Sequence, residues 1–170
     1  RQEVMRQAIE YSERRKAYYA GHCWNPFFIE GIKTLAFEVA EALGGRSPDY
    51  VVLPVGSGTL LLGVYKGFRE LLELELVDKM PRIIAVQAAG YESLYELLEG
   101  RRSGLERTEV ADGLRVPAPP RLEQVARAVR ESDGFCVVVS EEDVRESLRK
   151  LVSSGFIVEP TTATTLAGLE

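Results

Sequence analysis

Four consecutive residues near the middle of the chain, Gly56-Ser57-Gly58-Thr59, have the types and spacing of an anion-binding turn. They follow the apolar run Tyr50–Val55 and precede apolar residues at helical spacing, which predicts a strand, a turn and a helix start. The first N–H groups of a helix have no partner within the helix, and the positive end of its dipole lies beside them. Glycine permits close backbone approach and a positive φ, and the hydroxyls of Ser57 and Thr59 can donate hydrogen bonds. The turn is therefore a candidate phosphate site, although many strand-to-helix turns use glycine only for its geometry.

Segments with helical and strand-like patterns alternate around this turn. Helices are predicted near residues 28–43, 59–76 and 91–99, from 122, and after the capping residue Ser140, and strands at 50–55, 82–87 and 135–139. Gly44-Gly45 is typical of a helix C-terminus. Alternation with continuous Val, Ile and Leu strands predicts an α/β fold: one domain over residues 1–170, with three αβα layers and a mostly parallel sheet. Ligands of such sheets bind beyond the carboxyl ends of the strands, where the glycine turn lies.

The composition argues against several classes of function. The 170 residues carry a net charge of −5, which argues against nucleic-acid binding because phosphate backbones need clustered Lys and Arg. No apolar run reaches the ~20 residues of a membrane span, and no signal-peptide pattern is present, so a cytoplasmic protein is expected. Cys23, Cys136 and the single histidine make no convincing metal site, and no disulfide is expected. A Glu- and Arg-rich composition with one asparagine resembles that of proteins from hot environments.

Simple phosphate motifs do not identify the ligand. A dinucleotide-binding fingerprint needs a third glycine, but Leu61 stands at that position. Asp78 lies at a plausible distance for the acidic residue of that fingerprint, yet it follows a predicted helix rather than a second strand. The lysine-containing Walker loop is absent. The residues alone leave a cofactor phosphate and a substrate phosphate both open.

The chain looks like an internal fragment of a longer protein. Arg1 lies within an amphipathic helical pattern that includes Val4, Met5 and Ala8, and there is no initial methionine. Glu170 ends the chain in the middle of another pattern. We therefore expect residues 1–170 to be one α/β domain of a longer protein.

Five short segments occur in an order that carries a family resemblance. They are Asn25-Pro26-Phe27-Phe28-Ile29-Glu30-Gly31-Ile32-Lys33-Thr34, Pro54–Thr59, Arg82–Ala88, Ala111-Asp112-Gly113-Leu114 and Gly155–Pro160. The ordered set resembles the threonine synthases, which are pyridoxal-phosphate enzymes of fold type II, and the Ala-Asp-Gly segment resembles related dehydratases. The resemblance covers nearly the whole chain. It implies a lyase with the tryptophan synthase beta-like fold, in which this chain is similar to the large domain.

The resemblance also implies roles for individual residues. The turn Gly56, Ser57, Gly58 and Thr59 would hold the phosphate of pyridoxal phosphate. Gly113 and Glu159 would lie near its pyridine ring, although a loop glycine and a helix-start acid are ordinary alternatives for these two residues. Asn25 is a candidate substrate-binding residue. The full-length enzyme would act on a small amino acid and form a homodimer.

Two catalytic groups of the resembled family are expected outside this chain. The Schiff-base lysine of that family lies upstream, and the matching Lys33 belongs to the Asn-Pro segment, where a structural role is expected. The Ser or Thr that contacts the pyridine nitrogen lies in a later loop, beyond Glu170. No catalytic residue is therefore assigned within the chain, and the chain alone is expected to be inactive.

Alternatives remain open for the substrate and for the class of function. Threonine synthases act on O-phosphohomoserine, but His22-Cys23 replaces their Asn-Ser pair and Phe28 replaces their phosphate-binding arginine, which phenylalanine cannot imitate. His22 could act as a substituting cation or be an ordinary loop histidine. The enzymatic alternative is a serine/threonine dehydratase or another replacement enzyme of the same fold. The alternative of another class is a non-catalytic phosphate- or nucleotide-binding α/β module.

Overall fold

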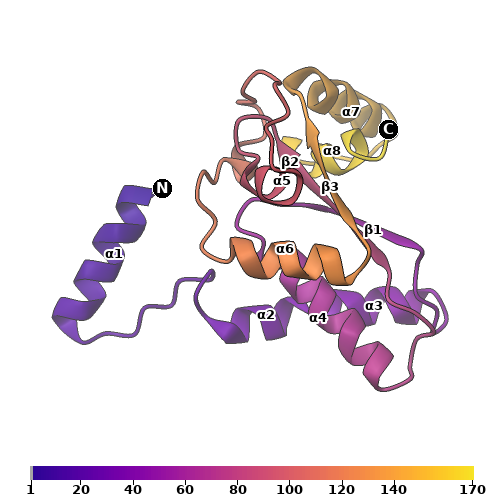
Figure 1. The fold of residues 1–170 in the computed structure, drawn as a ribbon, viewed down its shortest axis with the longest axis horizontal. Helices are drawn as coiled ribbons and strands as arrows, with labels where there is room; N and C mark the ends of the chain where they lie inside the picture. The colour runs from indigo at the N-terminus through magenta and orange to yellow at the C-terminus, as the bar shows by residue number, and fades with distance from the viewer. Residues whose placement is uncertain (1) are drawn as a thin grey trace.

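The structure, a computed structural model, describes residues 2–170. In chain order, its elements are α1 (Gln2–Arg15), α2 (Pro26–Ile32), α3 (Thr34–Ala42), β1 (Tyr50–Pro54), α4 (Thr59–Glu73), β2 (Arg82–Ala88), α5 (Ser93–Glu99), the short 3₁₀ helix η1 (Asp112–Leu114), α6 (Leu122–Glu131), β3 (Phe135–Val139), α7 (Glu141–Ser153) and α8 (Pro160–Ala167). Figure 1 shows these elements along the chain. The alternation of helices and strands confirms the predicted α/β class.

The three strands form one parallel sheet in the order β1-β2-β3. Val52 pairs with Ile84 across the first ladder, and Ala85 pairs with Cys136 across the second. The central strand β2 is buried along almost its whole length, which explains its continuous apolar run. Strand β1 lies at an edge, and its first residue, Tyr50, is 49% exposed, so this strand is less buried than the sequence pattern predicts.

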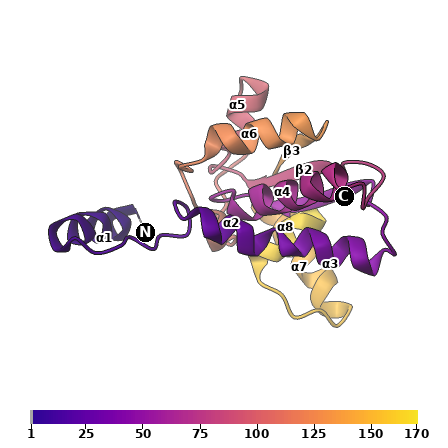
Figure 2. The ribbon, with the colours of Figure 1, turned by 90° about the horizontal axis from the view of Figure 1, so that it is seen from below.

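Helices cover both faces of the sheet, as predicted. Alternate residues of β2 point to opposite faces: Ile83 and Ala85 join a core with α3, α4, α5 and α6, whereas Ile84 and Val86 join a core with α7 and α8. Figure 2 shows α6 and α7 on opposite sides of the sheet. The largest fully buried side chain, Phe68, belongs to the first of these cores. The arrangement is therefore three-layered, with the carboxyl ends of all strands at one edge.

Helix boundaries follow local signals in most places. Gly45 has φ +80° and donates to the Ala40 carbonyl, as expected at a helix C-terminus, and Ser140 and Asp143 form the predicted capping box. The helix predicted over 28–43 is instead divided at Lys33. There the Thr34 hydroxyl donates to the Gly31 carbonyl at 3.0 Å, a back-bond that bends helices.

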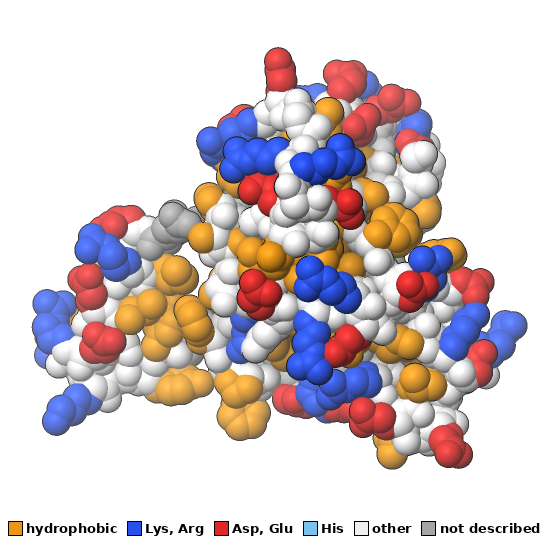
Figure 3. Space-filling model, in the orientation of Figure 1, with side chains coloured by type: hydrophobic (Ala, Val, Ile, Leu, Met, Phe, Trp, Pro, Cys, Tyr) orange, Lys and Arg blue, Asp and Glu red, His pale blue; other side chains and the backbone are white. Residues whose placement is uncertain are grey.

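The N-terminal helix α1 lies apart from the sheet and its covering helices (Figure 1). Val4 is 68% exposed and Met5 is 36% exposed, so the apolar side of α1 is not part of the main core. Figure 3 shows hydrophobic side chains gathered on the side of this helix that faces the rest of the molecule. Helix α1 is amphipathic as predicted, but its apolar side borders a cleft instead of a packed interior.

A cluster of ion pairs joins α2, the residue Lys33 and α4. The Lys33 Nζ lies 2.6 Å from Glu30 Oε2 and 2.8 Å from Glu70 Oε2, and Lys66 bonds both glutamates. Hydrogen bonds from Lys33 and Lys66 hold the pKa of Glu70 below its ordinary value. A carboxylate with a lowered pKa in the folded state stabilises the fold at neutral pH, and this contribution is lost as the pH falls through its folded pKa.

We expect Glu70→Gln to lower the Tm at pH 7 by a few degrees, because partly exposed ion pairs contribute little each but this carboxylate serves two lysines. The difference from wild type should shrink as the pH falls through the native pKa of Glu70, since the protonated acid also loses its charge. Thermal unfolding between pH 7 and pH 3 measures both effects. Glu73→Gln on the same helix is the control, because Glu73 is 65% exposed and pairs only with Arg69 among the described salt bridges. A constant gap at every pH would contradict the argument.

Candidate functional site

The predicted glycine turn joins β1 to α4 at the carboxyl edge of the sheet. The Val55 N–H donates to the Val86 carbonyl at 2.8 Å, which continues the sheet ladder by one residue. Gly58 then takes φ +82° as the N-cap of α4, a conformation that glycine adopts without strain. The Ser57 Oγ and the Thr59 Oγ1 lie 3.1 Å apart, on either side of Gly58. The strand, turn and helix start are therefore those predicted.

The backbone N–H groups from Gly56 to Leu61 have no hydrogen-bond acceptor among the described residues. Donors at the start of a helix need a side-chain cap, water or a ligand, and α4 has no side-chain cap. Helix α4 has 15 residues, and its dipole places partial positive charge beside these groups. The turn thus has the donors and the electrostatic field of a phosphate site.

The glycines of the turn are also required by their neighbours in the fold. A Cβ on Gly56 would lie 2.9 Å from the Gly113 carbonyl oxygen, and a Cβ on Gly58 would lie 2.3 Å from Val125 Cγ2. Both glycines are therefore in close contact with other parts of the protein itself. Packing and the positive φ at Gly58 account for these glycines without an anion, so the unpartnered N–H groups are the feature that indicates an anion site.

Gly113 lies directly beside the turn. Its N–H donates to Thr161 Oγ1 at 3.2 Å, and this contact attaches η1 to the first turn of α8. Glu159 is the N-cap of α8, and its side chain is exposed and makes no capping bond. Three predicted site segments, the turn, Gly113 and the start of α8, therefore lie next to one another. The charge of Glu159 also suits a helix N-terminus, so both interpretations of this residue stand.

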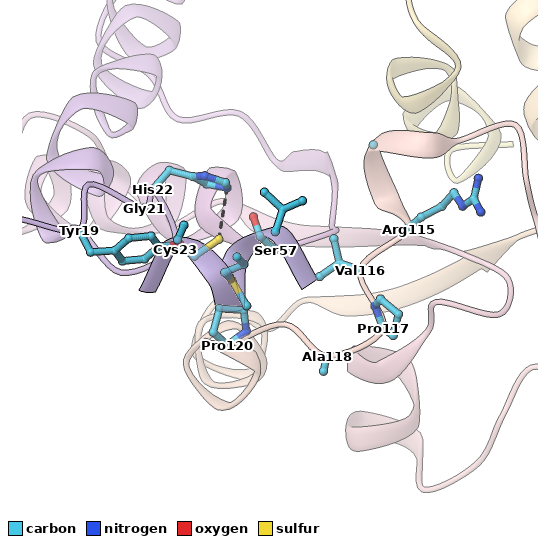
Figure 4. A pocket seen from close by; sticks show the side chains of 14 residues that line it. Tyr19, Gly21, His22, Cys23, Ser57, Arg115, Val116, Pro117, Ala118 and Pro120 are labelled. Atoms are coloured by element: carbon cyan, nitrogen blue, oxygen red, sulfur yellow. Dashed lines mark hydrogen bonds between the residues drawn. The ribbon is translucent and has the colours of Figure 1, made fainter. Parts of the chain in front are cut away.

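A cleft of about 460 Å³ opens between α1 and the sheet edge (Figure 4). Its wall includes Ser57 and Gly113 from the predicted site. The remaining lining residues come from α1, the segment after it and the loop before α6: Val4, Met5, Ala8, Tyr19, Gly21, His22, Cys23, Arg115, Val116, Pro117, Ala118 and Pro120. The lining is mostly apolar. A ligand whose phosphate lay at the turn would have room for an apolar ring in this cleft.

Residues of the segment before α2 have two different roles: one caps the helix and others line the cleft. The Asn25 Oδ1 accepts a hydrogen bond from the Phe27 N–H at 2.9 Å and caps α2, and Asn25 is not among the described residues that line the cleft. His22 and Cys23 do line it. The His22 ring lies 5.4 Å from the Phe28 ring, so two of the three residues that depart from the resembled motif touch each other.

Gln87 is a residue of this region to which the sequence pattern assigned no role. It is fully buried, and its Oε1 accepts hydrogen bonds from the Leu94 N–H at 2.9 Å and the Tyr95 N–H at 3.0 Å. Its Nε2 lies 3.4 Å from the Val55 carbonyl, which immediately precedes the turn. One side chain thus connects β2, the start of α5 and the entrance to the glycine turn. The sequence feature that could have indicated this role is an uncharged polar residue within an otherwise apolar strand.

Lysine is absent from the described lining of the cleft. Lys33 and Lys66 belong to the cluster between α2 and α4, Lys79 pairs with Asp49, and Lys150 pairs with Glu146 at 3.1 Å. These lysines have the structural partners expected of surface ion pairs. These four lysines and the glycine turn therefore lie in different parts of the described structure, and the fifth lysine, Lys16, does not line the cleft either.

Metal-ligand clusters and membrane-spanning helices are both missing from residues 2–170. No group of three or more His, Cys, Asp or Glu side chains in this range is placed to hold a metal ion. Every helix there is too short or too polar to span a lipid bilayer. Cys23 and Cys136 are both free.

The family model described as pyridoxal-phosphate dependent enzyme matches residues 1–170. Threonine synthase from Methanocaldococcus jannaschii is 30% identical over 167 residues, which are 95% of this chain and 41% of the relative. Threonine synthase from Methanosarcina acetivorans is 33% identical over 150 residues, which are 85% of this chain and 37% of the relative. The chain thus spans about two fifths of the length of these curated relatives.

Solved structures show the same fold. A threonine deaminase from the organism abbreviated T.th. is 30% identical, with a TM-score of 0.66 over 86% of this chain and 51% of that chain. A serine racemase from Dictyostelium discoideum has a TM-score of 0.73 over 97% of this chain and 50% of that chain, at 22% identity, so it is evidence for the fold alone. The predicted likeness to fold type II enzymes is confirmed.

Proposed function

Because this chain belongs to the family of pyridoxal-phosphate-dependent enzymes, we propose that its glycine turn binds the phosphate of that cofactor as part of a threonine-synthase-like lyase. The observation that carries the proposal is the row of unpartnered N–H groups from Gly56 to Leu61 at the start of α4. The hydroxyls of Ser57 and Thr59 would add donors. Gly113 and Glu159 are proposed to lie near the pyridine ring, because their segments adjoin the turn.

The residues present fit the cofactor in charge and in shape. The turn provides N–H donors and no carboxylate, as a phosphate dianion requires, and the adjoining cleft of about 460 Å³ is mostly apolar, as an aromatic ring prefers. When bound, the cofactor supplies an electron sink for carbanion chemistry. The glycine turn of this chain would hold the phosphate, and Val116 and Pro117 in the cleft wall would offer an apolar surface to the ring and help to orient the cofactor.

We further propose that the lysine that holds the cofactor covalently is supplied from outside residues 1–170. The ion-paired positions of Lys33, Lys66, Lys79 and Lys150 support this, and Lys16 is not among the residues that line the cleft. The 170-residue chain alone should then show no sustained turnover, and the complete protein is proposed to work as a homodimer on a small amino acid. Steady turnover by the isolated chain would contradict the proposal.

The substrate is proposed to be O-phosphohomoserine, which the likeness to curated threonine synthases supports. A serine or threonine dehydratase is the second candidate, because the structure of a threonine deaminase is also 30% identical to this chain. Assays of the complete protein with O-phosphohomoserine, threonine and serine distinguish the two. Phosphate release from O-phosphohomoserine supports the first, and ammonia release from threonine or serine without it supports the second.

Binding of the phosphate by the turn can be measured on the chain itself. We expect pyridoxal phosphate to shift the amide resonances of residues 56–61, and to bind about 100-fold more tightly than pyridoxal, because charge-assisted hydrogen bonds contribute about 1.5–3 kcal/mol each. Two-dimensional amide NMR with both compounds gives the affinities and the location. Equal affinity for the two compounds, or shifts that avoid the turn, would remove the basis of the assignment.

A further inference from the structure

Two neighbouring side chains in the cleft form a pair that the phosphate site does not use. The Cys23 Sγ lies 3.2 Å from the His22 Nε2, and both residues line the cleft. Figure 4 shows this contact beside Ser57. A neutral imidazole accepts a hydrogen bond from the thiol, and after proton transfer the imidazolium N–H donates to the thiolate. This is the arrangement in which a histidine activates a cysteine.

The backbone around the pair is held by several contacts. The Trp24 N–H and the Asn25 N–H both donate to the Gly21 carbonyl, at 2.9 Å and 3.1 Å, and close a tight turn. The Arg121 Nε donates to the Cys23 carbonyl at 2.6 Å, which ties this turn to the start of α6. The thiol is therefore on an anchored segment.

The imidazole is also oriented by its surroundings. The His22 ring packs against Phe28 with a centroid distance of 5.4 Å and an interplanar angle of 50°. Phe28 belongs to the first turn of α2, which Asn25 caps. The ring contact and the capped helix together restrict the positions open to the imidazole near the thiol.

The second cysteine of the chain provides a natural comparison. Cys136 lies in the central layer on β3 and is 5% exposed, and burial raises the pKa of its thiol. Its sulfur has no histidine nearby, because the only histidine of the chain is His22. Cys23, in contrast, is half-buried at the wall of an open cleft. The two thiols should therefore differ strongly in reactivity.

We propose that Cys23 and His22 act as a nucleophilic pair that captures soft electrophiles, of the class of α,β-unsaturated carbonyl compounds, within the cleft. His22 Nε2 takes the thiol proton. The sulfur forms a bond to the β-carbon of the alkene, whose π electrons move to the carbonyl oxygen as an enolate. The proton then returns to the α-carbon, so that nothing is released and no oxidant is needed. The adduct occupies the cleft next to Ser57, which makes this pair a modification site that controls access to the glycine turn.

The apolar lining suits such compounds. Met5, Tyr19 and Pro120 offer contact to an uncharged organic electrophile, and no carboxylate of the described residues belongs to the lining. The titratable groups described beside the thiol are His22, which it contacts, Arg121, whose Nε donates to the Cys23 carbonyl, and the Tyr19 phenol in the same lining. The Arg115 guanidinium, also in the lining, pairs instead with Glu109 and Asp112.

Labelling with N-ethylmaleimide tests the proposal on the purified chain. We expect one adduct per chain at pH 7, located at Cys23 by peptide mapping, with Cys136 unmodified until the protein is unfolded. His22→Gln should slow the labelling at pH 7 by about tenfold or more, because it removes the base. At pH 10, where hydroxide ionises thiols without help, the two proteins should react at equal rates. A merely structural role of His22 would slow the reaction at both pH values.

Two variants serve as controls. Cys136→Ala should label as wild type does, and Cys23→Ser should take no label while keeping its circular dichroism spectrum. Because His22 is the only histidine, its imidazole resonance is identified without assignment, and its chemical shift should change in Cys23→Ser because the contact with the thiol is lost. Labelling of Cys136 before Cys23, or an unchanged rate in folded His22→Gln at pH 7, would overturn the proposal.

Discussion

Ser57→Asp should weaken pyridoxal phosphate binding by at least about 100-fold. Ser57 lies between Gly56 and Gly58 at the start of α4 and lines the cleft, so an aspartate there would face the proposed phosphate position. Two unit charges about 4 Å apart repel by about 4 kcal/mol at an effective dielectric constant of about 20. Screening at a half-buried site lowers this figure, but the phosphate carries nearly two charges.

Ser57→Asn is the matched control, because asparagine has nearly the shape of aspartate without its charge. We expect the asparagine variant to bind within about tenfold of wild type. Both variants should unfold at similar temperatures, because Ser57 belongs to none of the three hydrophobic core clusters. Calorimetric titration and thermal unfolding of all three proteins supply the data. If aspartate and asparagine weaken binding equally, charge is not the cause, and the turn does not bind the phosphate.

Much of the fold could be predicted because its boundaries are set by local chemistry. Ser140 with Asp143, and Gly45 after α3, act on neighbouring backbone groups within a few residues, so their effects can be deduced from sequence. At Lys33, where the helix predicted over 28–43 is divided, the local Thr34 hydroxyl bond to the Gly31 carbonyl is only part of the cause. The division also accompanies contact with another element, since a Cβ on Gly67 of α4 would lie 2.5 Å from the Lys33 carbonyl oxygen.

The candidate site was predictable to the extent that it is a local motif. The turn at residues 56–59 and its place after β1 follow from spacing alone. The closeness of Gly113 to the turn depends on packing between segments more than fifty residues apart in the chain, and only the family resemblance indicated it. The His22–Cys23 contact was missed because adjacent residues in a loop reveal nothing about side-chain direction, and rotamers here depend on Phe28.

Gln87→Met should destabilise the chain by about 2–4 kcal/mol, although methionine has nearly the same volume. Gln87 is completely buried, and its loss leaves the Leu94 and Tyr95 N–H groups and the Val55 carbonyl without this partner. Each unsatisfied buried group costs about 1–3 kcal/mol. Urea unfolding measures the change, and amide exchange at the start of α5 should accelerate. Gln124→Met on the exposed side of α6 is the same substitution without burial and should change stability little.

The same variant tests whether Gln87 positions the glycine turn. Gln87 contacts the Val55 carbonyl, which immediately precedes Gly56. Without this contact the Val55 peptide can rotate, and the N–H groups of the turn would then lose their common orientation. Gln87→Met should therefore weaken pyridoxal phosphate binding more than a variant of equal stability loss on the opposite face, such as Val144→Ala in the core between the sheet and α7. If the two variants bind equally well, Gln87 stabilises the fold without orienting the site. A selective loss would mean that a buried amide in the central strand sets the geometry of the anion site at the edge of the sheet.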